Sequence, residues 1–264
     1  MYFTRDFRIS LTMLGKSTNI SNKGFLSILQ DIAEMHSASI GYGVTDIEKT
    51  NYSWALLNWK VKILSRPKYG EIVTIKTWAR QYTKLYCYRD FEVFNSKGES
   101  IAIISSKWIL IDVLKGKIAR LENTLLELYQ PENKSVFDIV ELDKLSEPQS
   151  YLKTIDYTIR KSDIDINEHV NNLCYLDIAL EAFPGDSNEF NNLNEFEILY
   201  KHQIKINDKI TASYCLENDK HCIVIKSADG KTLHSILKFK WYFYVVYLND
   251  VCNWDASPIA HILY

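Results

Sequence analysis

The segment DIDINEHVNN, residues 163–172, contains residue types suited to acid–base chemistry. Asp165, Asn167 and His169 alternate along it, so an extended backbone would point all three side chains to one side. The apolar run that follows predicts a helix, whose first N–H groups lack partners and carry a partial positive charge. A carboxylate, an amide and an imidazole that converge there could activate water and stabilise an oxyanion during hydrolysis.

The same three residues also have a purely structural interpretation. Asp165 and Asn167 could cap the helix, while His169 could bond to a nearby carbonyl group. The spacing favours neither interpretation by itself, so the choice depends on the elements that position the segment.

Two helices are expected. Residues 22–40 place apolar side chains on one helical face, and Gly41 and Gly43 follow as a stop signal. A second apolar run predicts a helix over residues 169–183, which would begin with His169 itself. The candidate residues would then lie at the entry of the second helix.

Strands are expected around both helices. Alternation and β-branched or aromatic enrichment predict strands at residues 53–64, 71–79, 85–94, 101–111, 151–160, 196–204, 209–216, 221–226 and 232–241. Gly98 predicts a hairpin turn between the third and fourth of these. Turn residues recur at a similar place in both halves: Asn207-Asp208 follows Gly70-Glu71 at a distance of 137 residues. We infer an internal duplication in which each helix is covered by the concave face of its own antiparallel sheet.

The length of 264 residues exceeds that of a usual single domain. The patterns divide the chain into an N-terminal domain (residues 1–121), a linker (122–150), a second domain (151–245) and a C-terminal extension (246–264) without an assigned role. The net charge of -2 gives no global basic field for nucleic acid.

The cysteines and the N-terminus exclude further classes. No cysteine spacing fits a metal site, so all five are expected to be reduced core residues: Cys87, Cys174, Cys215, Cys222 and Cys252. The charged N-terminus and the lack of a long apolar run argue against a signal peptide and a membrane span. A cytoplasmic protein is therefore expected.

The motif DxDxNxHVNNxxY resembles the signature of the plant plastid and bacterial acyl-ACP thioesterases, with Tyr175 in its expected place. Further similarity lies in LQDIAEMHSASIGYG, WALLNWKVKILSRPKYGEIVTIKTWA, YRDFEVFNSKG and SSKWILID. The resemblance implies an α+β double hot-dog fold, hydrolysis of fatty acyl-ACP in fatty acid biosynthesis, and no metal or organic cofactor. It also implies an acyl-chain pocket in the N-terminal domain and catalytic residues in the C-terminal one.

Within this resemblance, Asp165, Asn167 and His169 match the catalytic Asp, Asn and His of the family. The fourth catalytic residue of the family is a Glu three positions after a Tyr, and here Tyr200 places Gln203 at that position. A glutamine amide can hold a water molecule but cannot accept its proton. A different register would assign the acid function to Glu195 or Glu197.

We expect water to attack the thioester carbon while His169, or an acid-assisted network, removes its proton. Asp165 would orient the imidazole and Asn167 would position the substrate or oxyanion. The alternatives are an acyl-CoA thioesterase of the same fold, a non-catalytic acyl-binding protein and, more weakly, a hot-dog dehydratase. The expected partner is the acyl carrier protein, and the sequence leaves open whether the chain forms a homodimer. Its docking surface, unless these residues simply face solvent, would contain Lys60, Lys62, Arg66, Lys68, Lys201 and Lys205.

Overall fold

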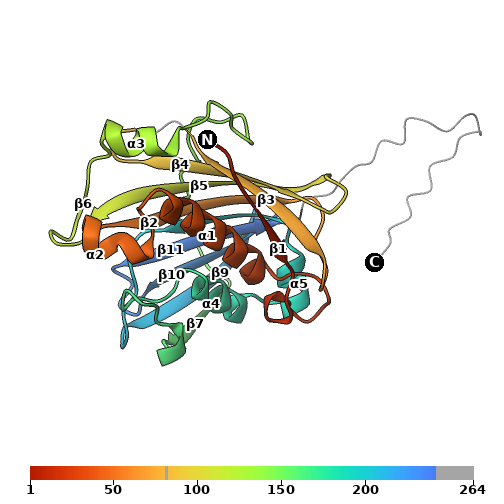
Figure 1. Cartoon of the computed structure of the whole chain (residues 1–264). Coiled ribbons are helices and arrows are strands. Elements are labelled where there is room, and N and C mark those ends of the chain that lie inside the picture. Colours follow the sequence, from red (N-terminus) through yellow and green to blue (C-terminus); the bar gives the residue numbers. More distant parts are fainter. Residues whose placement is uncertain (81–82, 242–264) are drawn as a thin grey trace, which may run out of the picture.

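The computed structural model describes residues 1–80 and 83–241, so Cys252 and the C-terminal extension lie outside the described residues. Two sets of elements follow one another along the chain (Figure 1). The first set comprises β1 (Phe3–Arg8), η1 (Leu11–Met13), α1 (Asn22–Ser39), η2 (Val44–Asp46), α2 (Ile47–Thr50), β2 (Tyr52–Ile63), β3 (Ile72–Ala79), β4 (Cys87–Phe94), β5 (Ser100–Asp112), β6 (Lys117–Ile118) and α3 (Asn123–Tyr129). The second comprises β7 (Lys153–Thr158), η3 (Lys161–Asp163), α4 (Cys174–Ala182), α5 (Ser187–Asn192), β8 (Glu195–Tyr200), β9 (Lys209–Glu217), β10 (Lys220–Ser227) and β11 (Leu233–Lys240).

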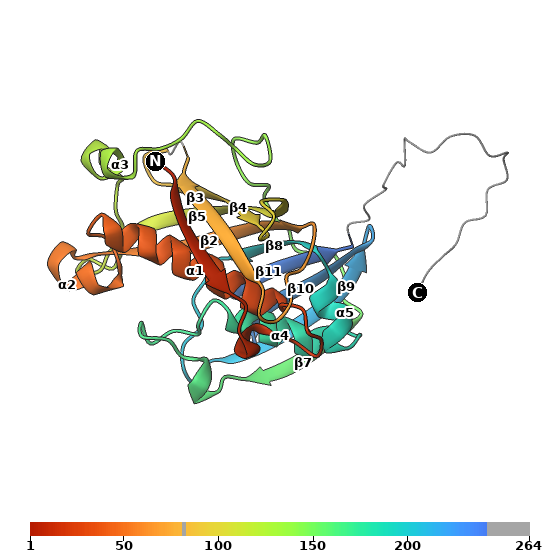
Figure 2. The ribbon, with the colours of Figure 1, turned by 45° about the vertical axis from the view of Figure 1, so that its right-hand side comes forward.

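The strands form one antiparallel sheet in the order β1-β3-β4-β5-β2-β8-β11-β10-β9-β7, with β6 paired to β5. Read outward from the centre, the two halves have the same order, so the internal duplication extends to the topology. The halves join where β2 pairs with β8, from Asn58 opposite Leu199 to Lys62 opposite Glu195. Both α1 and α4 lie on the same side of this sheet (Figures 1 and 2). The expected double hot-dog architecture is confirmed.

Helix α1 illustrates how the sequence pattern becomes packing. Phe25, Ile28, Leu29 and Ile32 repeat at helical spacing, and all four are completely buried against the sheet. Burial of each such side chain contributes roughly 1.5–3 kcal/mol. The helix begins where Ser21 Oγ accepts the Gly24 N–H at 3.0 Å. One continuous core then joins α1, α4 and strands from both halves of the sheet.

A strand occurs in each predicted strand segment, but β8 ends at Tyr200, so the strand predicted over residues 196–204 was four residues too long. The predicted Gly98 turn has a left-handed φ of 77°. The sequence pattern missed β1, which lies at the edge of the sheet against β3. Only Phe3 and Phe7 of this strand pack on the core, while Thr4, Arg5 and Asp6 are exposed. Its charged sequence therefore lacks the apolar alternation by which the other strands were recognised.

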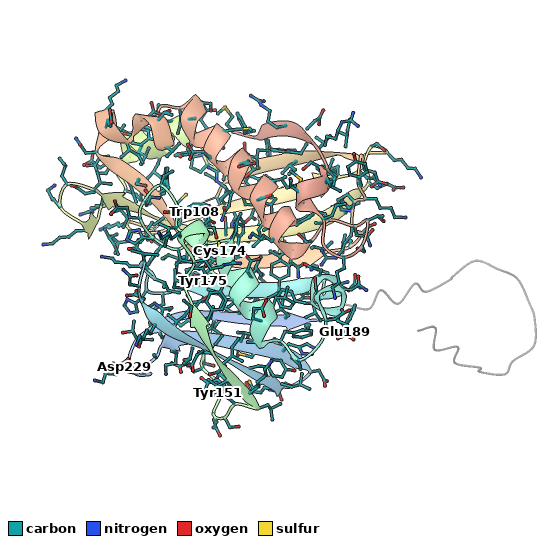
Figure 3. All side chains as sticks on the ribbon, turned by 90° about the horizontal axis from the view of Figure 1, so that it is seen from below. Trp108, Tyr151, Cys174, Tyr175, Glu189 and Asp229 are labelled. Carbon is teal, nitrogen blue, oxygen red and sulfur yellow. The ribbon has the colours of Figure 1, made fainter. Side chains whose placement is uncertain are left out.

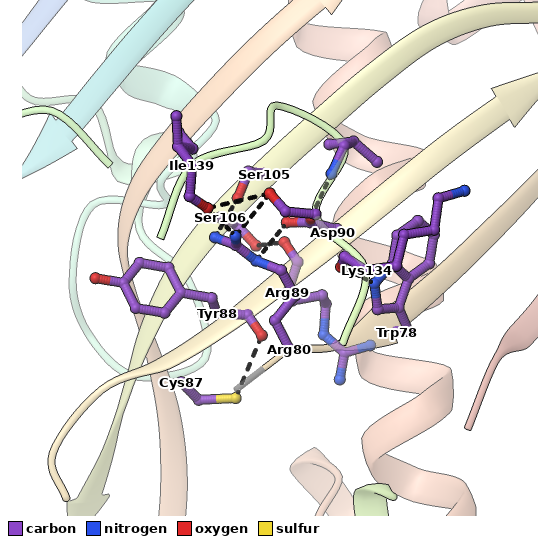
Figure 4. Close-up of polar contacts among 12 residues, drawn as sticks. Trp78, Arg80, Cys87, Tyr88, Arg89, Asp90, Ser105, Ser106, Lys134 and Ile139 are labelled. Carbon is purple, nitrogen blue, oxygen red and sulfur yellow. Dashed lines mark hydrogen bonds and ion pairs between the residues drawn. The ribbon is translucent and has the colours of Figure 1, made fainter. Parts of the chain in front are cut away.

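Residues 122–150 connect the two halves and pack closely over the N-terminal half of the sheet. Arg80 and Asp90, 5% and 0% exposed, form an ion pair with Nε and Oδ1 3.1 Å apart beneath this segment (Figure 4). Arg80 also donates to Ser135 Oγ at 2.8 Å, and Asp90 Oδ2 accepts the Val136 N–H at 2.9 Å. The Trp78 indole N–H donates to the Lys134 carbonyl at 2.9 Å. A buried ionic network thus anchors the connecting segment.

None of the described helices has both the length and the apolar sequence that crossing a lipid bilayer requires.

Candidate active site

Residues 164–170, which we call the polar loop, form a tight turn rather than the extended segment expected. Ile164 pairs with Val170 in an isolated antiparallel bridge, and the Asp165 N–H donates to the His169 carbonyl at 2.8 Å. Glu168 closes the turn with a left-handed φ of 61°. Helix α4 begins at Cys174, so the prediction of a helix from His169 was wrong by five residues. The backbone bonds of this turn compete with helix formation because they already use the N–H and carbonyl groups of the loop.

Asp165 holds the polar loop in shape. Its Oδ1 accepts the backbone N–H of Asn167 at 2.8 Å and that of His169 at 3.4 Å. This is the use of an aspartate side chain in an Asx-turn. The contacts of this carboxylate are therefore with the loop backbone, whereas the sequence led us to expect a contact with the imidazole.

The polar loop lies against the segment that follows β8. The Val170 N–H donates to the Ile204 carbonyl at 2.8 Å, and His169 faces Lys205 in an antiparallel bridge. Gln203 lies two residues from Lys205, so the fold brings this glutamine close to the loop. Asn167 and Gln203 are exposed, while His169 is half-buried. These side chains therefore lie at an accessible surface rather than in the core.

Two tyrosines fix this segment to α4. The Tyr200 hydroxyl donates to the Asn172 carbonyl at 3.1 Å, and its ring packs edge-on against Tyr175 with centroids 5.2 Å apart. Burial raises the pKa of both hydroxyls, so both remain hydrogen-bond donors. In Figure 3, Cys174 and Tyr175 lie on α4 at the centre of the molecule, and both belong to the shared core. This position gives Tyr175 a role in packing.

The N-terminal half contains a loop of the same build, residues 14–20, which we call the counterpart loop. Leu14 pairs with Ile20 as Ile164 pairs with Val170, 150 residues later. The residue after each loop donates a backbone hydrogen bond to the 3-10 turn that precedes the loop. Ser21 N–H donates to the Met13 carbonyl at 2.9 Å, and Asn171 N–H donates to the Asp163 carbonyl at 2.8 Å.

The outer contact of each loop is also repeated. Asn19 faces Lys68 in an antiparallel bridge as His169 faces Lys205. Ile20 donates to the Pro67 carbonyl at 3.0 Å, which matches the bond from Val170 to Ile204. The two loops therefore share these backbone contacts, although the left-handed φ of Glu168 and the bond from Asp165 N–H to the His169 carbonyl belong to the polar loop. The polar loop carries Asp165, Asn167 and His169 where the counterpart loop carries Gly15, Ser17 and Asn19.

A half-open cleft of about 310 Å³ lies between the first turn of α1 and α4, beside the counterpart loop. Its apolar wall includes Leu14, Leu176 and Phe190. Lys23 and Asp177 cross it as an ion pair, with Nζ and Oδ2 2.6 Å apart. None of the four predicted catalytic residues lines this cleft. The cleft therefore lies between the two halves of the molecule and does not include the polar loop.

The basic residues predicted to dock the carrier protein differ in whether their side chains are free to contact a partner. Lys60 is paired with Glu197 and Asp143 at 3.0 and 3.2 Å, and Arg66 is held by the Asn22 side chain at 2.7 Å. Both are thus engaged in contacts within the chain. The exposed members of the set are Lys68, Lys201 and Lys205.

Buried titratable groups elsewhere are poor candidates for catalysis. Burial raises the pKa of the Cys174 thiol, which disfavours a thiolate nucleophile. His36 is completely buried against Arg89, with Nδ1 and NH1 2.9 Å apart. Burial, with help from Arg89, lowers the pKa of His36 to about 3, so this imidazole is neutral. Within the described residues, no group of three His, Cys, Asp or Glu side chains could hold a metal ion.

Comparison with protein families finds a matching family domain for each half of the chain. Residues 1–129 match the acyl-ACP thioesterase N-terminal domain, and residues 146–240 match the acyl-ACP thioesterase C-terminal domain. The chain therefore belongs to the acyl-ACP thioesterase family.

Individual relatives are distant in sequence. The chloroplastic oleoyl-acyl carrier protein thioesterase 1 of Arabidopsis thaliana is 22% identical over 228 residues, which cover 79% of this chain and 62% of that protein. The chloroplastic palmitoyl-acyl carrier protein thioesterase of the same plant is 26% identical over 215 residues, covering 77% of this chain and 52% of that protein. The chain thus spans between half and two thirds of the length of these relatives.

Solved structures confirm the fold. An acyl-ACP thioesterase from Bacteroides thetaiotaomicron superposes with a TM-score of 0.78 at 21% identity, covering 90% of this chain and 97% of the other. The 12:0-ACP thioesterase from Umbellularia californica superposes with a TM-score of 0.76 at 20% identity, covering 91% and 97%.

Proposed function

We propose that this protein hydrolyses fatty acyl-ACP thioesters to free fatty acid and ACP. The observation that carries this proposal is the duplicated loop. Of two loops with matching bridges, one bears a carboxylate, an amide and an imidazole at an accessible surface. Membership of the acyl-ACP thioesterase family supports the choice of a thioester and of the acyl carrier protein.

In the proposed mechanism, water adds to the thioester carbon and the half-buried His169 accepts its proton. The exposed Asn167 amide donates to the carbonyl oxygen, which becomes negatively charged in the tetrahedral intermediate. Collapse of this intermediate breaks the carbon–sulfur bond, and the proton returns from His169 to the departing sulfur. Asp165 acts indirectly, because its two bonds to the loop backbone hold Asn167 and His169 in place.

The experiment that tests this function is fatty acid release by the purified protein from acyl-ACP and acyl-CoA substrates of several chain lengths. We expect equal amounts of free fatty acid and thiol, with a higher kcat/KM for acyl-ACP. Faster hydrolysis of acyl-CoA would favour the acyl-CoA thioesterase. Binding without release from any substrate would instead identify a non-catalytic acyl-binding protein.

Gln203 gives a second prediction. It occupies the position of the family's Glu, whereas the alternative acids Glu195 and Glu197 form ion pairs with Lys240 and Lys60 at 3.0 Å. The substitution Gln203→Glu changes almost no volume but adds an ionisable acceptor beside the proposed water. We expect a higher kcat, or at least a new titrating group in the pH–rate profile, with unchanged chain-length preference.

The matched variant is Gln203→Ala, which removes the amide without adding a charge. Loss of activity in Gln203→Glu together with normal activity in Gln203→Ala would show that the register is wrong. Glu195 or Glu197 would then become the candidate acid.

A further inference from the structure

We propose that Lys205 is a further catalytic residue, whose ammonium group stabilises the negative charge on the thioester carbonyl oxygen during hydrolysis. The inference rests on the proposed function and adds a residue to its site. It begins from the antiparallel bridge that places Lys205 directly opposite His169, although 36 residues separate them along the chain.

The type of pairing determines how close the two side chains lie. Because Val170 donates to the Ile204 carbonyl, the adjacent pair of His169 and Lys205 is a non-hydrogen-bonded pair. In such pairs the side chains leave the same face, with Cβ atoms about 4.5–5.5 Å apart. The flexible four-carbon stem of a lysine then lets its ammonium group reach a substrate carbonyl held beside the imidazole.

The backbone of Lys205 is held in place on its C-terminal side. Its N–H donates to Asp208 Oδ2 at 2.8 Å, and its carbonyl accepts the Asp208 N–H at 3.2 Å. Asn207 between them adopts a left-handed φ of 72°, which defines a tight turn. The base of the lysine side chain is thus fixed relative to the polar loop, while the chain end remains exposed to a substrate.

The charge of Lys205 is available for this role. Among the described residues, no carboxylate lies within ion-pair distance of its ammonium group, in contrast to Lys60 on β2. The neighbouring Gln203 is neutral, so the lysine is a cation beside a site whose transition state gains negative charge. A cation at that position is most favourable when the carbonyl oxygen becomes an oxyanion, which lowers the barrier rather than only strengthening binding.

In the reaction, the water oxygen bonds to the thioester carbon and the carbonyl electron pair moves to the oxygen beside Lys205. The water proton passes to His169. When the carbonyl re-forms, the carbon–sulfur bond breaks and His169 returns the proton to the sulfur, leaving a thiol and a carboxylic acid. Lys205 keeps its own proton throughout, so its contribution is electrostatic.

The duplication provides a matched control in the same molecule. Lys68 faces Asn19 in the counterpart loop as Lys205 faces His169, and it is also exposed. Its N–H donates to Glu71 Oε2 at 3.0 Å, which repeats the bond from Lys205 to Asp208. Substitution of either lysine by methionine removes the same charge from equivalent surroundings, and only Lys205 lies beside the imidazole.

The experiment compares wild-type protein with Lys205→Met, Lys205→Arg and Lys68→Met on S-acyl-N-acetylcysteamine thioesters, which lack the carrier protein, and on acyl-ACP. We expect Lys205→Met to lower kcat by about 10-fold or more on both substrates, with little change in KM. Lys205→Arg should recover most of the rate because it restores the charge. On the thioesters that lack the carrier protein, Lys68→Met should match wild type, because Lys68 lies beside the counterpart loop. Thermal unfolding verifies that every variant is folded.

Three results would overturn the proposal. Wild-type kcat in Lys205→Met would show that the charge does not act on the reaction. Equal losses in both methionine variants on the carrier-free thioesters would indicate a general charge effect. A rise in KM confined to acyl-ACP would assign Lys205 to carrier docking. These results leave hydrolysis by the wild-type protein intact, whereas failure of the wild type on every thioester would overturn the proposed function and this inference together.

Discussion

His169→Ala and Asn167→Ala are each expected to lower kcat by about 10²-fold or more while leaving the protein folded. The loss follows from removal of the proposed proton acceptor in one variant and of an oxyanion donor in the other. Stability should be retained because Asn167 is exposed and His169 is only half-buried on a surface turn. Thiol release from an acyl thioester measures kcat, and circular dichroism with thermal unfolding verifies the fold.

The counterpart loop supplies the control for these variants. Asn19→Ala removes a polar side chain from the position that matches His169, so it should leave turnover unchanged. Wild-type turnover in a soluble His169→Ala or Asn167→Ala variant would disprove the assignment of the polar loop as the active site. An equal loss in Asn19→Ala would mean that loop packing, and not chemistry, explains the effect.

Asp90→Ala is expected to destabilise the protein by about 3–5 kcal/mol, because it leaves the buried guanidinium of Arg80 without its carboxylate. Both side chains are almost fully buried, and Asp90 also accepts the Val136 N–H from the connecting segment. The free energy of unfolding, measured by urea denaturation, tests this expectation.

Two variants test whether loss of the buried ion pair, and not another effect of the substitution, lowers the stability of Asp90→Ala. Joint replacement, Arg80→Met with Asp90→Leu, removes both charges and should cost less than Asp90→Ala alone, because no unpaired charge remains buried. Lys134→Met breaks the more exposed pair with Glu92 on the same segment and should change stability by about 1 kcal/mol or less. Equal losses in Asp90→Ala and Lys134→Met would contradict the importance of burial.

Much of the architecture follows from local patterns. The apolar face of α1 and the alternation of the central strands are properties of single segments, because periodicity reports which face of an element is buried. The exposed edge strand β1 shows the limit of this signal, since Phe3 and Phe7 are its only side chains that pack on the core. Helix α4 shows another limit, because the backbone bonds of the polar loop delay its start to Cys174.

The sequence by itself determined the candidate residues Asp165, Asn167 and His169, since their types and spacing are local. Only the tertiary structure decided that Asp165 bonds to the loop backbone, because an Asx-turn depends on the actual dihedral angles of the loop. The internal duplication was visible as a spacing of landmarks, but the repeated loops and their shared hydrogen bonds became evident only in the fold.

Tertiary structure also placed Lys205 opposite His169. It likewise placed the pair of Arg80 and Asp90 beneath residues 135 and 136, to which both side chains bond. Neither neighbourhood has a periodic signal in the sequence, because each joins segments that are far apart along the chain. Sheet order and register set such contacts, and these arise from packing of the whole core rather than from the preference of any one segment. The candidate catalytic residues could therefore be predicted one by one from the sequence. The charged groups that surround them depended on which distant segments became neighbours in the fold.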